Sequence, residues 1–119
     1  MLGKGTILCV DDESSVLSTT KTILARAGYA VLSATNITEA IEVVRNRTVD
    51  VILLDAVPGS EFLIDVAKRS SPDVRVVIHS GAATAVRNVD GCLLKPVSPR
   101  ELLRAMAEYL DRKSTGSGD

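Results

Sequence analysis

The chain has 119 residues, enough for one domain with a single core, and its 14 basic and 15 acidic residues leave a formal net charge of −1. This balance excludes a strong overall field for nucleic acid or anionic membranes, so we expect direct binding to neither. Apolar residues make up 45% of the chain and aromatic residues only 3%, which predicts an aliphatic core and favours α/β layers. Because no apolar stretch approaches the ~20 residues of a membrane span and no signal-like segment begins the chain, we expect a cytoplasmic protein.

The first predicted strand, residues 6–10, runs directly into three acids. Its apolar run is short and rich in branched residues, which is typical of a strand buried on both faces. Asp11, Asp12 and Glu13 therefore fall at its carboxyl end, where ligands bind in α/β sheets. Adjacent carboxylates repel one another, and a cation is the simplest way to neutralise them.

Four further strands are predicted at residues 29–34, 49–55, 74–80 and 91–94, and helices at about 14–28, 36–47, 60–69 and 98–112. The third strand ends in Asp55 and the fourth in Ser80, while Lys95-Pro96, a candidate cis peptide, follows the fifth. Alternating strands and helices predict a doubly wound α/β sandwich, with a parallel sheet and helices on both faces. The polar strand ends then meet at one edge of the sheet.

Local signals mark the helix starts. Asn36 with Glu39 and Ser98 with Glu101 form capping boxes, and a serine at position 14 or 15 is expected to cap the first helix. The third helix is expected to pack through its apolar residues, including Phe62.

Three further expectations concern the cysteines, the segment before the fifth strand and the tail. Cys9 and Cys92 lie in apolar runs and are expected to be buried small hydrophobes rather than a disulfide. Residues 81–91 are weakly patterned and leave room for a short helix at most. Residues 114–119 are expected to form a flexible tail or linker after a domain of residues 1–113.

The polar residues at the strand ends form a set with a common chemistry. Mg²⁺ prefers oxygen ligands and is commonly held by one or two carboxylates with a phosphate oxygen, a need that Asp11, Asp12 and Asp55 meet. Lys95 supplies a positive charge for phosphoryl oxygens and Ser80 a hydrogen bond. The expected ligand is therefore a phosphoryl group with Mg²⁺ as cofactor.

In its order and residue types this set closely resembles the receiver domain of two-component response regulators. The matching motifs are VDDE after the first strand, LLD at the third, Ser80 with Gly81 at the fourth and Lys95-Pro96 at the fifth. The resemblance covers about residues 6–110 and implies a flavodoxin-like fold with strand order 2-1-3-4-5.

The resemblance also implies roles for single residues. Asp55 would be the phosphoacceptor, taking a phosphoryl group from a phosphohistidine of a sensor histidine kinase or a histidine phosphotransfer protein. Asp12 and Asp55 would bind Mg²⁺ directly, Asp11 largely through water, and the Val57 backbone carbonyl would complete the ligands. Lys95 would pair with the phosphoryl group, and residue 80 would move toward it.

Further implications of the resemblance concern the assembly and the output. The domain would be a monomer or weak dimer that switches an output partner or a linked effector domain. It would not be an enzyme beyond its own phosphorylation and dephosphorylation.

Three departures from the family pattern stand out. One residue fewer than usual separates Asp55 from the loop proline, so the assignment of Val57 is less direct than that of the carboxylates. The interval from Ser80 to Lys95 is shorter by roughly two helical turns, so the fourth helix is expected to be short or missing. Cys92 stands where an aromatic switch residue is usual. We therefore expect signalling through an altered surface.

Two other functions fit parts of the pattern. One is a degenerate receiver that binds proteins independently of phosphorylation. The other is a Mg²⁺-dependent aspartyl phosphatase of the haloacid-dehalogenase kind, whose Asp-x-Asp arrangement differs from the adjacent Asp11 and Asp12. His79, the only histidine, is expected on the face of its strand opposite to Ser80, without a functional role.

Overall fold

The structure is a computed structural model that describes residues 4–81 and 86–116, with side chains up to Asp111. Its centre is one parallel sheet of five strands in the order β2-β1-β3-β4-β5. The strands are β1 (Thr6–Val10), β2 (Ala30–Ala34), β3 (Val51–Leu54), β4 (Arg75–Ser80) and β5 (Gly91–Leu94). The predicted fold class and strand order are therefore confirmed.

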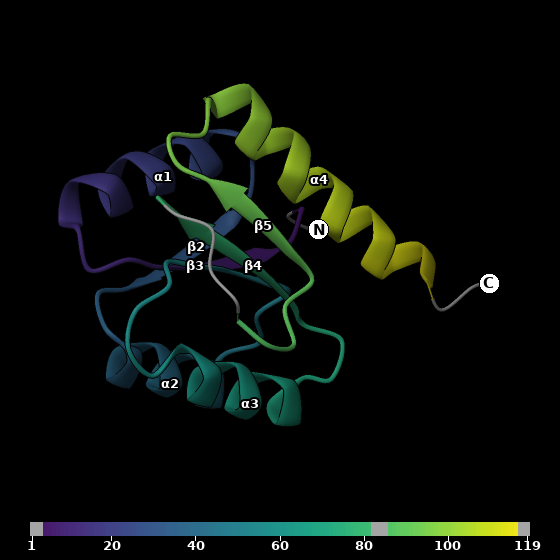
Figure 1. Cartoon of the computed structure of the whole chain (residues 1–119). Helices are drawn as coiled ribbons and strands as arrows, with labels where there is room; N and C mark the ends of the chain where they lie inside the picture. Colours follow the sequence, from purple (N-terminus) through teal and green to yellow (C-terminus); the bar gives the residue numbers. More distant parts are fainter. Residues whose placement is uncertain (1–3, 82–85, 117–119) are drawn as a thin grey trace.

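Helices cover both faces of the sheet. Figure 1 shows α1 (Ser14–Arg26) and α4 (Pro99–Gly116) on one face, and α2 (Ile37–Asn46) and α3 (Ser60–Ser70) on the other. Among the described residues no helix lies between β4 and β5, and residues 82–85, on which part of the prediction of a short helix falls, lie outside the described part. None of the helices in the described ranges has the length and apolar character to cross a bilayer.

The two faces of the sheet form two separate cores, as strand alternation requires. Along β3, Ile52 and Leu54 pack with Leu63 on the side of α2 and α3. Leu53 packs with Met106 on the side of α1 and α4. All four residues of β3 are buried, which explains why this central strand has no alternation of apolar and polar residues.

The predicted capping boxes form, with one variation. Asn36 accepts a hydrogen bond from the Glu39 N–H at 2.9 Å, but the Glu39 carboxylate reaches back to the N–H and hydroxyl of Thr35. At α4, Ser98 and Glu101 bond each other reciprocally.

The predicted serine cap of α1 was wrong. Its N-cap is Glu13 with no side-chain cap, because the preceding turn is closed by Asp11 Oδ1, which accepts the Glu13 N–H at 2.9 Å.

Helix α4 also ends later than predicted, at Gly116, so it passes the expected domain end at residue 113.

Two apolar side chains lie elsewhere than expected. Phe62 is 58% exposed, and Ile64 takes the inward position on α3 instead. Cys92 is exposed because no described helix covers the outer face of β5, whereas Cys9 is buried as predicted. Burial raises the pKa of the Cys9 thiol to about 12, so this group stays protonated and unreactive at neutral pH.

The short connection from β4 to β5 is tied down by Asp90 at the amino ends of the strands. Its Oδ2 accepts a hydrogen bond from the Val76 N–H at 2.7 Å and pairs with Lys68 Nζ at 3.0 Å, which brings in α3. Burial alone would raise the pKa of Asp90, but these contacts together hold it below the ordinary value. A side chain at Gly91 would collide with the Tyr109 hydroxyl of α4, so the glycine permits this close approach.

Replacing Asp90 with alanine is expected to lower the free energy of unfolding by about 1–3 kcal/mol, because the N–H of buried Val76 loses its carboxylate partner and the Lys68 ammonium keeps only the Val74 carbonyl. The matched control is Asp65→Ala, which breaks an exposed pair with Arg69 and should cost less than about 1 kcal/mol. Urea denaturation of both variants measures the difference. Equal losses would contradict the anchoring role of Asp90.

Candidate functional site

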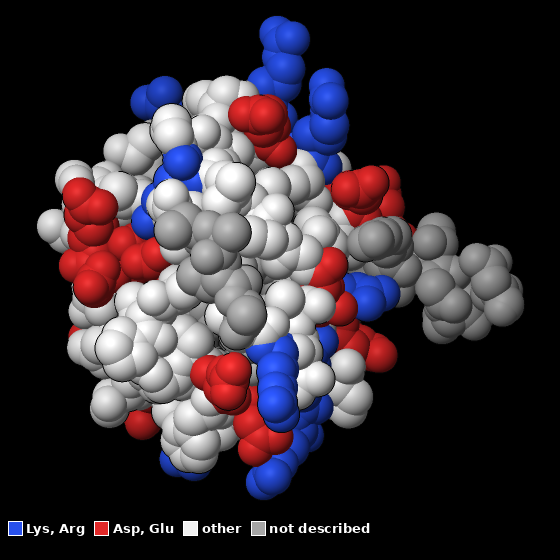
Figure 2. All heavy atoms as spheres, viewed as in Figure 1, with Lys and Arg blue, Asp and Glu red and all other residues white. Residues whose placement is uncertain are grey.

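The three predicted acids meet at the carboxyl edge of the sheet. Asp11 follows β1 and Asp55 follows β3, and the Asp55 N–H donates to the Val10 carbonyl at 2.8 Å, which holds the two strand ends together. One carboxylate oxygen each from Asp11, Asp12 and Asp55 can be chosen so that all lie within 4.8 Å of one another. Figure 2 shows acidic side chains gathered beside the start of α1.

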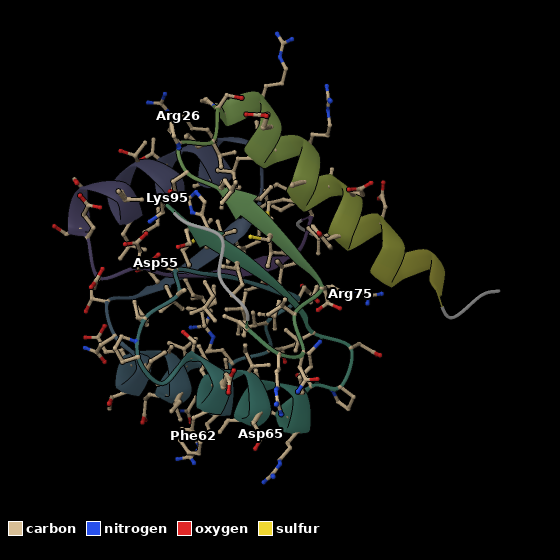
Figure 3. The ribbon with its side chains drawn as sticks, viewed as in Figure 1. Arg26, Asp55, Phe62, Asp65, Arg75 and Lys95 are labelled. Carbon is tan, nitrogen blue, oxygen red and sulfur yellow. The ribbon has the colours of Figure 1, made fainter. Side chains whose placement is uncertain are left out.

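Lys95 reaches this acidic cluster from the end of β5, as Figure 3 shows for Lys95 and Asp55. Its Nζ lies 2.6 Å from Asp11 Oδ2 and 3.6 Å from Asp55 Oδ1. Burial alone would lower the pKa of Lys95, but the hydrogen bond to Asp11 and the two negative charges raise it above the ordinary value. The lysine is therefore a fixed cation. The peptide bond from Lys95 to Pro96 is cis.

Asp11 is the most constrained of the acids. It is buried, its Oδ1 accepts the Glu13 N–H and its Oδ2 accepts the Lys95 ammonium. Asp12 is exposed and Asp55 half-buried. The three acids thus differ in how freely they could bind an ion, with Asp12 the most open.

Ser80 also ends at this edge. It is buried at the end of β4, opposite Leu94 of β5, and its carbonyl accepts the Lys95 N–H at 2.7 Å. The backbone pairing of β4 with β5 therefore places the serine and the lysine at the same end of the sheet. The five residues predicted to act through their side chains, Asp11, Asp12, Asp55, Ser80 and Lys95, therefore all lie at that edge.

The Val57 carbonyl is turned toward α3. Its oxygen accepts hydrogen bonds from the Ser60 hydroxyl at 2.6 Å and from the Ser60 N–H at 3.1 Å. A carbonyl oxygen has two lone pairs, and both are used here. An ion could bind this oxygen only after at least one of these bonds breaks, so the arrangement gives the expected role of Val57 no support.

His79 lies on the other face of β4, as alternation predicts. It is 7% exposed and borders a pocket between α1 and α4, together with Lys95. Burial, and then the charge of Lys95, hold the pKa of His79 below its ordinary value, while Asp11 and Asp55 act in the opposite direction. Its imidazole is therefore neutral at neutral pH.

Comparison with known proteins assigns the arrangement to a family. The family model "Response regulator receiver domain" matches residues 7–107. The chain belongs to the response regulator receiver domain family. Receiver domains are signalling domains of response regulators, which interact with histidine kinases.

Individual relatives are response regulators too. The receiver domain is 35% identical over 118 residues to the alginate biosynthesis transcriptional regulatory protein AlgB of Pseudomonas syringae pv. tomato, covering 91% of this chain and 26% of that protein. It is 34% identical to the phosphate regulon transcriptional regulatory protein PhoB of Pseudomonas aeruginosa, covering 100% of this chain and 56% of that protein. The chain thus spans only part of the length of these relatives.

Solved structures agree with this assignment. A CheY-like receiver domain protein from Methanospirillum hungatei JF-1 superposes with a TM-score of 0.85 and 29% identity, covering 94% of this chain and 98% of that one. The receiver domain of the hybrid histidine kinase CckA gives a TM-score of 0.78 and 30% identity, covering 89% and 99%.

The pocket that His79 borders in this receiver domain was not predicted from the sequence. The available signal was Thr20, a hydroxyl within the apolar stripe of α1, which the structure places in the same pocket. The Asp90 contacts were missed as well, because they join residues that no local pattern relates.

Lowering the pH from 7.5 to 5.5 is expected to destabilise the domain through His79. Its folded pKa lies below the unfolded value of about 6.5, so the unfolded chain binds the proton first and stability falls as the pH drops through this range. In His79→Gln this part of the loss should disappear, and the shift in the thermal unfolding midpoint should be smaller. Identical shifts in both proteins would show that the imidazole does not titrate differently on unfolding.

Proposed function

We propose that this receiver domain accepts a phosphoryl group on Asp55 from a phosphohistidine of a sensor histidine kinase or a histidine phosphotransfer protein. The observation that carries the proposal is that Asp55 belongs to a cluster of three carboxylates and that its Oδ1 lies 3.6 Å from the ammonium group of Lys95. A carboxylate nucleophile beside a fixed cation suits phosphoryl transfer, in which charge on the transferred oxygens must be stabilised.

The cluster fits Mg²⁺ as a cofactor. Its donors are carboxylate oxygens, which this ion prefers, and few protein ligands are needed because Mg²⁺ retains water. We propose Asp12 and Asp55 as direct ligands and Asp11 as a ligand through water, since both Asp11 oxygens already accept hydrogen bonds. When bound, the ion would reduce repulsion between the Asp55 carboxylate and an anionic donor.

The transfer step follows from these positions. An Asp55 carboxylate oxygen attacks the phosphorus, the bond from phosphorus to the donor imidazole nitrogen breaks, and its electron pair stays on that nitrogen. The product is an acyl phosphate on Asp55. The Lys95 ammonium then leaves Asp11 and pairs with the new phosphoryl oxygens, and the Ser80 hydroxyl donates a hydrogen bond to them.

The output step uses an altered surface. At position 92, where the family resemblance leads us to expect an aromatic switch residue, the side chain is an exposed cysteine. Leu94 is 56% exposed on the same strand. We propose that the phosphorylated domain changes its contacts with an output partner or a linked effector domain around β5, without an aromatic rotation.

This same exposed strand favours one rival function, a receiver that binds proteins independently of phosphorylation. An aspartyl phosphatase is less well supported. Its nucleophile would be Asp11, the first acid of the pair Asp11 and Asp12, but both Asp11 carboxylate oxygens already accept hydrogen bonds, from the Glu13 backbone N–H and the Lys95 ammonium. The two functions differ in whether Asp55 is modified.

Treatment with acetyl phosphate and Mg²⁺ should add the mass of one phosphoryl group to the domain, seen by intact mass spectrometry. The adduct should be absent in Asp55→Asn and retained in Asp50→Asn, a control acid at the opposite end of β3. No adduct in the wild type would favour the binding module. Rapid release of phosphate from a small ester that depends on Asp11 or Asp12 would favour the phosphatase.

Mg²⁺ affinity should fall by on the order of tenfold or more in Asp12→Asn, because the site loses a carboxylate ligand and its charge. Glu13→Gln is the matched control, since it removes the same charge from the adjacent exposed residue outside the cluster. Isothermal titration with MgCl₂ measures both affinities. A loss of the same size in the two variants would indicate only a general effect of charge.

A further inference from the structure

The outer side of α4 carries a stripe of charged side chains whose sign reverses along the helix. Arg100 and Arg104 lie in its first turns, Glu108 and Asp111 follow, and all four are exposed. Successive spacings of four, four and three residues place these side chains along one side of the helix. Figure 2 shows basic side chains projecting over the start of α4, whose course is given in Figure 1. This charged stripe is therefore basic at one end and acidic at the other.

Three charges of the stripe have no ion-pair partner among the described side chains. No ion pair joins Arg100, Arg104 or Glu108 to another group there, although Arg104 and Glu108 are only one helical turn apart. Glu101 is the acid next to Arg100 in the sequence, but its carboxylate accepts hydrogen bonds from the N–H and hydroxyl of Ser98. The charges of the stripe therefore remain available to a second molecule.

The order of the charges limits what can bind along the stripe. A partner helix needs acidic groups opposite the two arginines and basic groups opposite the two acids. A second copy of α4 supplies this order when it runs antiparallel, because a two-fold axis turns the helix end for end. An axis midway between Arg104 and Glu108 places each Arg104 opposite the second copy's Glu108. Arg100, four residues before Arg104, then lies close to the second copy's Asp111, three residues after Glu108.

The same alignment brings apolar side chains together. Ala107 is exposed close to the axis, and its small side chain lets two helices approach closely. Leu103 and Leu110 are half-buried and seven residues apart, hence on one side of the helix, and the axis places each Leu103 near the second copy's Leu110. Exposed ion pairs contribute little by themselves, so these apolar contacts supply the burial that an association requires.

We propose that the receiver domain forms a weak two-fold dimer by antiparallel packing of α4 against α4 of a second copy. The self-complementary charges of the stripe carry this assignment, which does not depend on phosphorylation of Asp55. The contact also leaves the exposed side chains of β5 open. Leu93 packs in the core on the side of α4, so its neighbours Cys92 and Leu94 lie on the opposite face of the sheet.

Sedimentation velocity of the full chain over a concentration series tests the dimer, with a reductant present because Cys92 is exposed. The dimer fraction should rise with concentration and fall at a salt concentration of about 0.5 M, since exposed ion pairs are screened. Arg104→Glu and Glu108→Arg should each weaken association by about tenfold or more, because each change makes two attractive pairs repulsive. The double variant restores both pairs with exchanged signs, so its affinity should return to within about threefold of the wild type.

The matched control is Arg45→Glu, the same charge reversal at an exposed position of α2, which should leave association unchanged. In the ¹⁵N-labelled chain, amide shifts should depend on concentration at Ala107 and not at Cys92 or Leu94. A chain that stays monomeric, a dimer that both single reversals leave intact, or a double variant that does not recover would overturn the proposal. Concentration-dependent shifts at Cys92 and Leu94 with none at Ala107 would overturn it too, because they would place the contact at β5.

Discussion

The ion pair between Asp11 and Lys95 is the contact on which the site depends. It joins residues 84 positions apart at 2.6 Å, and so connects the end of β1 to the end of β5. Without a cation at this edge, the carboxylates of Asp11, Asp12 and Asp55 would repel one another within a few ångströms. Lys95 relieves part of that repulsion while leaving Asp12 open and Asp55 half-buried. The proposed nucleophile, Asp55, and the proposed ion ligand, Asp12, thereby stay available in a cluster whose charges would otherwise repel one another.

A second charged contact, at Asp90, holds the opposite end of β5. The Asp90 carboxylate accepts hydrogen bonds from the Val76 N–H and the Lys68 ammonium. These contacts join β4, β5 and α3 at the short connection between β4 and β5. Strand β5 is therefore fixed at both ends by charge, while its outer face keeps Cys92 and Leu94 exposed. If Lys95 changes its contact at one end of β5, the strand can shift and alter the position of the exposed side chains of Cys92 and Leu94.

Much of this arrangement could be predicted from the sequence, because short apolar runs ending in polar residues fix both the parallel sheet and the edge where those residues meet. The acids, Ser80 and Lys95 were found in this way, as were the caps at Asn36 and Ser98. Phe62 was placed wrongly because, in the consecutive apolar residues 62–64, helical spacing does not show whether Phe62 or Ile64 faces inward beside Leu63. The Asp90 contacts and the pocket at Thr20 and His79 depend on distances between elements, which no local pattern contains.

The most direct test of the central claim, that Lys95 is held by Asp11 and passes to a phosphoryl group on Asp55, is a crystal structure of the domain with Mg²⁺ and beryllofluoride. We expect the beryllium on an Asp55 oxygen and Lys95 Nζ in contact with a fluorine, no longer 2.6 Å from Asp11 Oδ2. Beryllofluoride on Asp11 or Asp12, or on Asp55 with Lys95 still bound to Asp11, would contradict the account.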